Sequence, residues 1–344
     1  MRLLPAAIVI LALTKCAGTI TGLPFRSEPV QSTCCRTGED PPVVVEYLGN
    51  GGIFLRRGDD AILTAPFFSN PHLLRAGFLP IPAARERVLR HMHRVEGLEL
   101  VDVVLAGHGH YDHLLDLPAV FETLPRETRL YGNDTTVAIL GRALHDRVTS
   151  VAADAGNDHK PGRWTTVGNV RFMPIDTEHA PHFHGLKFYG GEVPTSLAEL
   201  PRRATGWKEG KPLAFLLDFL RDGRIDFRVY YNDSAHSSPF GKPDPATLAE
   251  HCVDLAIVTV ASFHEVRNYP EWLIDSLRPR HVLLAHWDDF FTSSEAGERA
   301  VRFTNVPKFV ERLAAVYPRS DTTILHRHQR LTFIAPPPSP TANR

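Results

Sequence analysis

Three histidines and one aspartate fall within six consecutive residues of this sequence, which reads His108-Gly109-His110-Tyr111-Asp112-His113. Imidazole nitrogens and carboxylate oxygens are ligands that zinc, iron and manganese accept in proteins. At a strand-to-helix turn, the first and third of these residues can point to one side and the fifth and sixth to another. One short segment could therefore serve two adjacent metal ions, and Gly107 and Gly109 allow the tight backbone that this needs.

An apolar run at residues 101–105 leads directly into this segment, and its composition is typical of a buried strand. A histidine-rich surface loop would not need such a strand, which favours a metal site. His179, Asp233 and His286 also follow apolar runs. Each is a weaker signal, because a single histidine is usually structural and an Asn-Asp-Ser sequence often forms a turn or helix cap. The residues alone leave alternatives open, namely His182 and His184 in place of His179, and His264 in place of His286.

The segment His108–His113 resembles the signature of the metallo-β-lactamase superfamily, and the resemblance spans roughly residues 43–334. It implies an α/β fold, a four-layer αββα sandwich. It also implies that His108, His110 and His179 bind one metal ion, and that Asp112, His113 and His286 bind a second. Asp233 would then bridge the two ions, so the resemblance implies a complete set of seven ligands.

Shorter similarities point to one branch of this superfamily, which contains ascorbate-6-phosphate lactonase and N-acylphosphatidylethanolamine phospholipase D. They comprise residues 110–114, residues 285–290 (Ala-His-Trp-Asp-Asp-Phe) and the Tyr47-Leu48-Gly49 sequence before an expected hairpin. The sequence departs from the family pattern in two places. Ala65-Pro66 stands where the family has Asp-Pro, an aspartate that commonly supports metal ligands, and Asp233 lies in Asn-Asp-Ser rather than Gly-Asp-Thr.

This resemblance implies a hydrolase with two divalent metal ions, zinc being expected and manganese or iron the alternatives. A hydroxide bound by both ions would attack a phosphodiester, a phospholipid or a related ester. The expected catalytic residues are Asp112, Asp233 and His264, the last as a pocket histidine that protonates the leaving group. A lactonase or amidase using the same centre is an alternative. Two alternatives from other classes are a non-catalytic metal-binding surface protein and an iron oxidoreductase, although no flavodoxin-like segment follows to support the latter.

The hydrophobic pattern predicts strands followed by helices, twice over. Expected strands cover residues 43–48, 53–57, 61–64, 101–105, 129–131, 169–175, 213–219, 225–231, 254–260, 281–285, 323–325 and 331–334. Expected helices cover residues 83–95, 114–123, 135–144, 270–277 and 307–317. Residues 67–82 are expected to form an apolar, proline-rich loop, and residues 182–211 an irregular segment around the site. This order predicts two packed sheets with helices outside them.

The composition is that of an ordinary globular protein, with 344 residues, 43% of them hydrophobic, and a net charge of −1. No basic patch indicates nucleic-acid binding, so the expected partner is a small-molecule or lipid substrate. No linker-like segment divides the middle, which predicts a single hydrolase domain over residues 41–335. Residues 19–40 are expected to be a flexible N-terminal segment and residues 336–344 a disordered tail. The oligomeric state is left open.

Arg2 followed by an apolar run at residues 3–13 predicts a signal peptide over residues 1–18, because this run is too short to span a bilayer. A buried N-terminal strand or helix is the alternative. The run ends near Cys16, which suggests membrane association through lipid attachment there, with cleavage just after Gly18 as the competing interpretation. The protein is therefore expected to be secreted, periplasmic or membrane-anchored outside the cytoplasm. In such an oxidising compartment, Cys34 or Cys35 could pair with Cys252.

Overall fold

The computed structural model describes residues 20, 22–26, 28–31, 41–182 and 184–334 of the chain. The expected signal peptide, with Cys16, the expected tail at 336–344, and Cys34 and Cys35 lie outside these residues. Within them, no helix combines the length and the apolar character that crossing a membrane requires.

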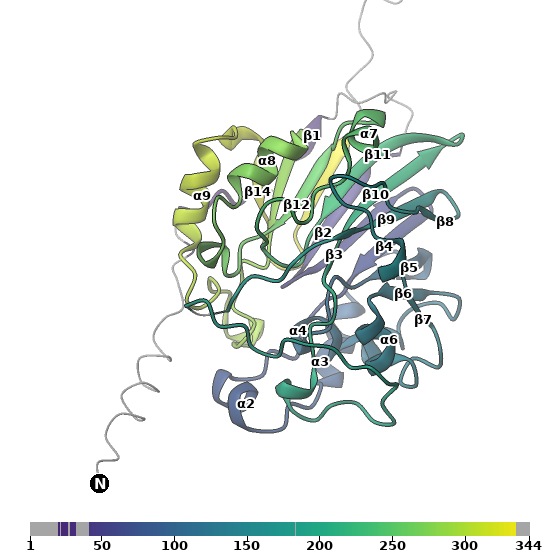
Figure 1. Ribbon diagram of the computed structural model, residues 1–344, viewed down its shortest axis with the longest axis vertical. Helices are drawn as coiled ribbons and strands as arrows, with labels where there is room; N and C mark the ends of the chain where they lie inside the picture. Colours follow the sequence, from purple (N-terminus) through teal and green to yellow (C-terminus); the bar gives the residue numbers. More distant parts are fainter. Residues whose placement is uncertain (1–19, 21, 27, 32–40, 183, 335–344) are drawn as a thin grey trace, which may run out of the picture.

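The described strands form two sheets (Figure 1). The eight-stranded sheet has the order β1-β15-β2-β3-β4-β5-β6-β7, and the seven-stranded sheet has the order β14-β13-β12-β11-β10-β9-β8. The first sheet comprises β1 (Val30–Gln31), β2 (Val43–Gly49), β3 (Gly52–Arg57), β4 (Asp60–Thr64), β5 (Val101–Leu105), β6 (Arg129–Gly132), β7 (Val148–Ser150) and β15 (Arg330–Ile334). The second comprises β8 (Thr165–Val167), β9 (Val170–Asp176), β10 (Leu213–Arg221), β11 (Arg224–Tyr231), β12 (Leu255–Thr259), β13 (His281–Ala285) and β14 (Thr322–Ile324).

Both sheets change from antiparallel to parallel pairing partway across. In the first sheet β2, β3 and β4 pair in antiparallel fashion, and β4 to β7 continue in parallel. In the second sheet β8 to β11 are antiparallel, and β11 to β14 are parallel. The strands β9, β11 and β13 consequently run in the same direction and end at the same edge of their sheet.

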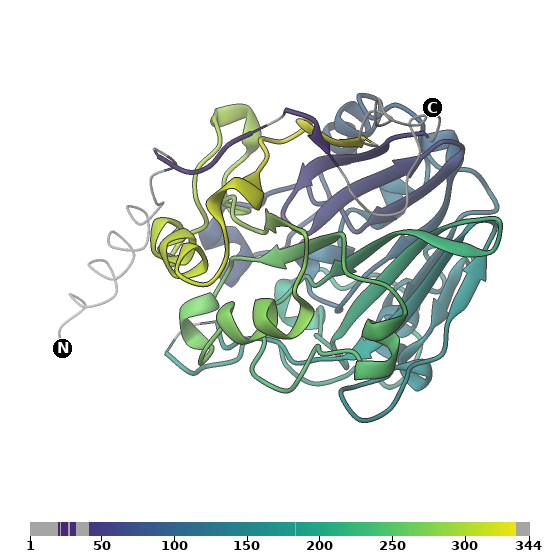
Figure 2. The same cartoon turned by 90° about the horizontal axis from the view of Figure 1, so that it is seen from above.

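Short helices cover the outer faces of the two sheets, as the view in Figure 2 shows. The helices of the first half are α2 (Leu73–Phe78), α3 (Arg85–Met92), α4 (Tyr111–Leu114), α5 (Leu117–Val120) and α6 (Asp134–Leu140). Those of the second half are α7 (Pro245–Glu250), α8 (Glu271–Leu277) and α9 (Val306–Ala314). The predicted four-layer αββα sandwich is confirmed.

Alternating side chains of the first sheet explain the layers. Ile53 and Leu55 of β3 join the core between the sheets, whereas Phe54 joins a second core beneath α3 and α5. Because neighbouring residues of a strand point to opposite faces, a strand that is apolar at every position must be covered on both sides. The all-buried strands β12 and β13 show the same requirement in the second sheet.

The structure corrects several element predictions. The expected loop at residues 67–82 contains the helix α2, and the single helix expected at 114–123 is two one-turn helices, α4 and α5. Strands β7 and β8 and helix α7 have no counterpart among the predicted elements, and each is only three to six residues long. Within the segment expected to be flexible, Val30–Gln31 pairs in parallel with β15.

Candidate metal centre

The segment after β5 is held in a shape that only glycine permits at two positions. A Cβ atom built on Gly107 would lie 2.3 Å from Oδ1 of Asp233, and one on Gly109 would lie 2.1 Å from the Lys208 carbonyl oxygen. His108 and His110 follow the strand in this tight loop. Asp112 and His113 then lie on the single turn of α4, so the chain changes direction between the two pairs.

The other three predicted ligands come from the second sheet. His179 follows β9, Asp233 follows β11 and His286 follows β13, where these strands end at a common edge. His286 adopts a φ of 52°, an uncommon conformation for a residue with a side chain. The structure therefore brings all seven predicted ligands together from two sheets.

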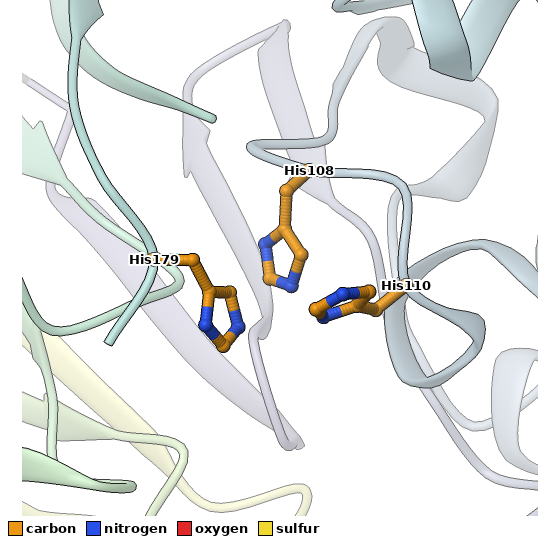
Figure 3. A group of neighbouring side chains, drawn as sticks. All are labelled: His108, His110 and His179. Carbon is orange, nitrogen blue, oxygen red and sulfur yellow. The ribbon is translucent and has the colours of Figure 1, made fainter. Parts of the chain in front are cut away.

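Two groups of side chains are arranged closely enough to bind one metal ion each. In the first, the ring centroids of His108 and His110 lie 4.6 Å apart, and that of His179 lies 4.6 and 4.7 Å from them. Figure 3 shows these three imidazoles facing a common point. In the second, Asp112 Oδ2 lies 3.3 Å from His286 Nε2 and 3.5 Å from His113 Nε2. Within each group, the potential ligand atoms all lie within 4.8 Å of one another.

Asp233 lies between the two groups. Its Oδ1 is 2.9 Å from Nδ1 of His108, and its Oδ2 is 3.6 Å from Nδ1 of His113. The Gly107 backbone N–H also donates to Oδ2, at 2.8 Å. This carboxylate thus contacts one histidine of each group, the place expected for a residue shared by two metal ions.

Unpartnered nitrogen atoms show that the site fits metal ions. Nε2 of His108 and of His110, Nδ1 of His286, and both ring nitrogens of His113 are buried without a hydrogen-bond partner in the described part of the chain. Leaving one buried polar group unpaired costs about 1–3 kcal/mol, so this concentration calls for a ligand. His179 Nδ1 donates to the carbonyl oxygen of Ala180 at 2.6 Å, which leaves its Nε2 lone pair available.

For His110, His113, His179 and Asp112, burial and mutual contacts favour the protonation states that bind metals. Burial, together with the neighbouring His108, lowers the pKa of His110 and of His179 well below the usual value. Burial likewise lowers the pKa of His113 to about 4. For Asp112, burial opposes ionisation, but His113 and His286 outweigh it and hold the carboxyl pKa well below its usual range. Neutral imidazoles and ionised carboxylates are the forms that bind metals.

Asn50 supports the second group and was missed by the sequence reasoning. The side-chain Nδ2 of Asn50 donates to the backbone oxygen of Asp112 at 2.6 Å. The backbone carbonyl oxygen of Asn50 accepts from the backbone N–H of His286 at 2.8 Å. Its N–H donates to Oδ1 of Asp288 at 2.9 Å, a carboxylate also bound by Tyr47 and Arg327. The Gly49-Asn50-Gly51-Gly52 sequence predicts a hairpin turn. An asparagine in such a turn gives no sequence indication that it also contacts metal ligands.

A cavity of about 360 Å³ opens over the two groups, with His110, Asp112, His179, Asp233 and His286 at its polar end. Apolar side chains form much of the remaining wall, among them Leu73 and Phe78 of α2, Phe188, Phe290, Phe291 and Phe303. Phe290, Phe291 and the α2 segment therefore supply an apolar lining. Trp287, the sequence neighbour of His286, is fully buried in the core.

The remaining histidine candidates lie in different places. His264, in a short 3₁₀ turn, has a 40% exposed side chain near Glu265 and does not line the cavity, so the structure does not bring it to the centre. His182 lines the cavity beside His179, whereas His184 is exposed. Two cationic side chains of the irregular segment at 182–211 are paired with carboxylates, Lys187 with Glu209 and Arg202 with Glu199.

Residues 61–208 match the Beta-lactamase superfamily domain. Solved structures that resemble this chain include the isothiocyanate hydrolase from Delia radicum gut bacteria, at 13% identity and a TM-score of 0.50, covering 85% of this chain and 100% of that one. The metallo-β-lactamase fold protein YhfI from Bacillus subtilis is 14% identical, with a TM-score of 0.49, covering 85% and 99%. No curated protein matches the sequence. Residues 61–208 are thus similar to the Beta-lactamase superfamily domain, and the chain has the metallo-β-lactamase fold.

Proposed function

We propose that this protein is a metal-dependent hydrolase that uses two divalent metal ions, zinc in the first instance, to cleave a phosphodiester, a phospholipid or a related ester. One observation carries the proposal: two groups of imidazoles and carboxylates, joined by Asp233 and containing five unpartnered ring nitrogens, lie at the polar end of an otherwise largely apolar cavity. A non-catalytic metal-binding protein would not need a substrate-sized cavity over its ligands.

The side chains of the centre would have distinct roles. His108, His110 and His179 would hold one ion, and Asp112, His113 and His286 the other, with Asp233 in contact with both groups. Bound ions would lower the pKa of a water molecule and polarise the electrophilic group of the substrate. The chain itself contributes the ionised carboxylates of Asp112 and Asp233, whose lowered pKa values keep their negative charge near neutral pH.

The cavity wall favours a substrate with an extended apolar part. Phe78 and Phe188 line the cavity, yet their side chains are 70% and 44% exposed. Leu79, next to Phe78, and Leu186, two residues before Phe188, are also exposed, and we call these four apolar side chains the lip of the cavity. Large apolar side chains left in water beside a cavity mark a surface that binds apolar partners. We therefore propose that the acyl or alkyl part of the substrate lies against this lip, and that the protein works outside the cytoplasm, as its N-terminal sequence predicts.

The first test measures metal content and turnover on the full-length protein. Elemental analysis should find about two metal ions per chain, and a chelator should abolish hydrolysis that added zinc restores. Substrates are bis(4-nitrophenyl) phosphate, 4-nitrophenyl acetate and decanoate, and a simple lactone. Phosphodiester or decanoate turnover supports the proposal, while turnover of the lactone alone favours the lactonase alternative. Metal uptake without any turnover favours the non-catalytic alternative, and failure to take up metal would overturn the assignment.

A second test asks whether the lip selects apolar substrates. The double variant Phe78→Ser, Phe188→Ser should lower kcat/KM for the decanoate by at least about tenfold, because each lost phenyl contact removes apolar burial. Turnover of the acetate should change less than about threefold. Val316→Ser is the matched control, since Val316 is 51% exposed and lies away from this cavity. An equal loss on both esters would contradict the selective role.

A further inference from the structure

His182 lies beside the first metal group without being part of it. Its ring stacks on that of His179, with centroids 4.7 Å apart and planes inclined by 19°, and lies 5.4 Å from the ring of His110. It lines the same cavity as the candidate ligands. The compact groups of potential ligand atoms nevertheless leave His182 out. Its position therefore needs an explanation other than metal binding.

Backbone contacts give His182 and His179 opposite tautomers. The Phe188 backbone N–H donates to Nδ1 of His182 at 3.1 Å, and a nitrogen that accepts a hydrogen bond carries no proton. The proton of the His182 ring is therefore on Nε2. His179 Nδ1 instead faces a carbonyl oxygen, so it carries the proton and leaves Nε2 free to bind metal. A protonated Nε2 cannot be a ligand, which assigns the ligand role to His179 and a donor role to His182.

The segment that carries His182 is fixed by its own hydrogen bonds. The His182 N–H donates to the Leu186 carbonyl oxygen at 2.8 Å. The backbone N–H groups of His184 and Gly185 donate to the two carboxylate oxygens of Glu265, each at 2.8 Å. Glu265, the sequence neighbour of His264, therefore anchors the backbone two and three residues after His182. The His182 ring is thus oriented before any substrate arrives.

We propose that Nε2–H of His182 donates a hydrogen bond to the substrate oxygen that gains negative charge during hydrolysis. No described residue accepts a hydrogen bond from this nitrogen, which leaves the donor available at the cavity. The role rests on the proposed hydrolase function and makes His182 a substrate-contacting residue. A preorganised donor of this kind stabilises the transition state more than the ground state, so its removal should lower kcat more than it raises KM.

The kinetic test compares His182→Phe with His182→Gln on whichever substrate the parent protein cleaves. Phenylalanine keeps a flat ring but has no donor, so kcat should fall about 100-fold while metal content stays at the parent value. Glutamine can place an amide N–H near the former Nε2 position and should bring kcat back within about tenfold of the parent. His159→Phe is the control, because the His159 side chain is 87% exposed.

A second measurement does not depend on activity. Long-range proton–nitrogen NMR of histidine-labelled protein should show the Nε2–H tautomer for His182 and the Nδ1–H tautomer for His179, and added zinc should shift the nitrogens of His179 but not those of His182. Full activity of His182→Phe, loss of metal in that variant, or an Nδ1–H tautomer at His182 would each overturn the donor role. A parent protein that binds zinc but hydrolyses nothing would refute the proposed function itself, and that result appears before any variant is made.

Discussion

At the scale of single residues, the site depends on side chains that bind no metal. Ala65 stands where the family resemblance leads one to expect a supporting aspartate. The structure instead places Asn50 in contact with two candidate ligands. Its side-chain amide donates to Asp112, and its backbone carbonyl oxygen accepts from His286. Groups that orient metal ligands typically change metal affinity 10- to 100-fold when removed. Asn50 is therefore the residue to test for a supporting role.

Asn50→Gly should weaken binding of one metal ion by about 10- to 100-fold and leave the other bound. Glycine accepts the φ of 56° at this position without strain, so the variant removes only the side-chain amide. Chelator competition and elemental analysis measure the effect. Asn268→Gly is the matched control, because Asn268 has a φ of 58° and is exposed away from the centre. Unchanged affinity for both ions in Asn50→Gly would disprove the supporting role.

Gly107→Ala tests the close approach of the backbone to Asp233. The added Cβ would lie 2.3 Å from Oδ1, so the carboxylate would have to leave its place between the two groups. We expect loss of bound metal and of hydrolysis. Gly190→Ala is the control, since its Cβ would have no neighbour within 4 Å. A Gly107→Ala protein with normal metal content would show that Asp233 has more freedom than this geometry allows.

The sequence was informative about the centre because its ligand types are rare in apolar surroundings. The segment at 108–113 could be recognised as a candidate metal site from its residue types and the apolar strand before it, whereas the seven-ligand set was implied by the family resemblance. The structure brings His179, Asp233 and His286 to this segment as expected. The choice between His179 and His182 could not be made from spacing, because it depends on which backbone group meets each ring. His264 was expected at the centre and Glu265 was not. Glu265 accepts hydrogen bonds from the backbone N–H groups of His184 and Gly185, a contact that no sequence pattern indicates.

At the scale of elements, one carboxylate joins the metal-binding segment to the loop before α2. Asp116, at the start of α5, accepts from the backbone N–H groups of Phe68 and Ser69 at 2.7 and 2.8 Å, and from the Ser69 hydroxyl. That loop leads to the lip of the cavity. The position of α2 therefore depends on a residue only three positions after His113.

Asp116→Asn should destabilise the protein by about 2 kcal/mol, because one amide cannot accept all three hydrogen bonds that the carboxylate accepts. The effect should be concentrated in the loop. We expect faster hydrogen exchange at the Phe68 and Ser69 amides and a lower unfolding free energy in urea. Asp102→Asn is the control, since Asp102 is exposed on β5. Unchanged exchange at both amides would show that other contacts hold the loop.

Long elements were predictable and short ones were not. The strands expected at residues 213–219 and 225–231 are confirmed as β10 and β11, which form a hairpin whose turn residues Asp222 and Gly223 both have positive φ. Strands β7 and β8 have three residues each, too few for a hydrophobic period to appear. The helix expected at 114–123 divides at Leu115 and Asp116, where the carboxylate turns toward the loop.

At the scale of the whole molecule, stability should fall in mild acid because buried histidines must remain neutral. Burial lowers the pKa of His281 in β13 to about 4, whereas an unfolded histidine titrates near 6.5. Between these values the unfolded chain binds more protons than the folded one. The contribution of His281 is therefore complete above about pH 6.5 and is lost as the pH falls toward 4.

His281→Asn should make the unfolding free energy less sensitive to pH. Between pH 7.5 and pH 5 the parent should lose about 2 kcal/mol more than the variant, from the difference of the two pKa values. Urea unfolding at both pH values measures this, on protein stripped of metal so that ligand protonation is common to both samples. His159→Asn, at an exposed position, should show the parent's full loss. Equal losses in the parent and His281→Asn would contradict the neutral state of His281.

The centre takes four of its seven candidate ligands from the segment after β5 and three from the ends of β9, β11 and β13. The separation of these two sets therefore depends on the spacing of the two sheets, between which core side chains such as Leu55 and Leu217 pack. Ions of different radius prefer different ligand separations. A preference of this centre for one divalent ion over another would consequently depend on the core packing, and a conservative core substitution should alter that preference without changing any ligand.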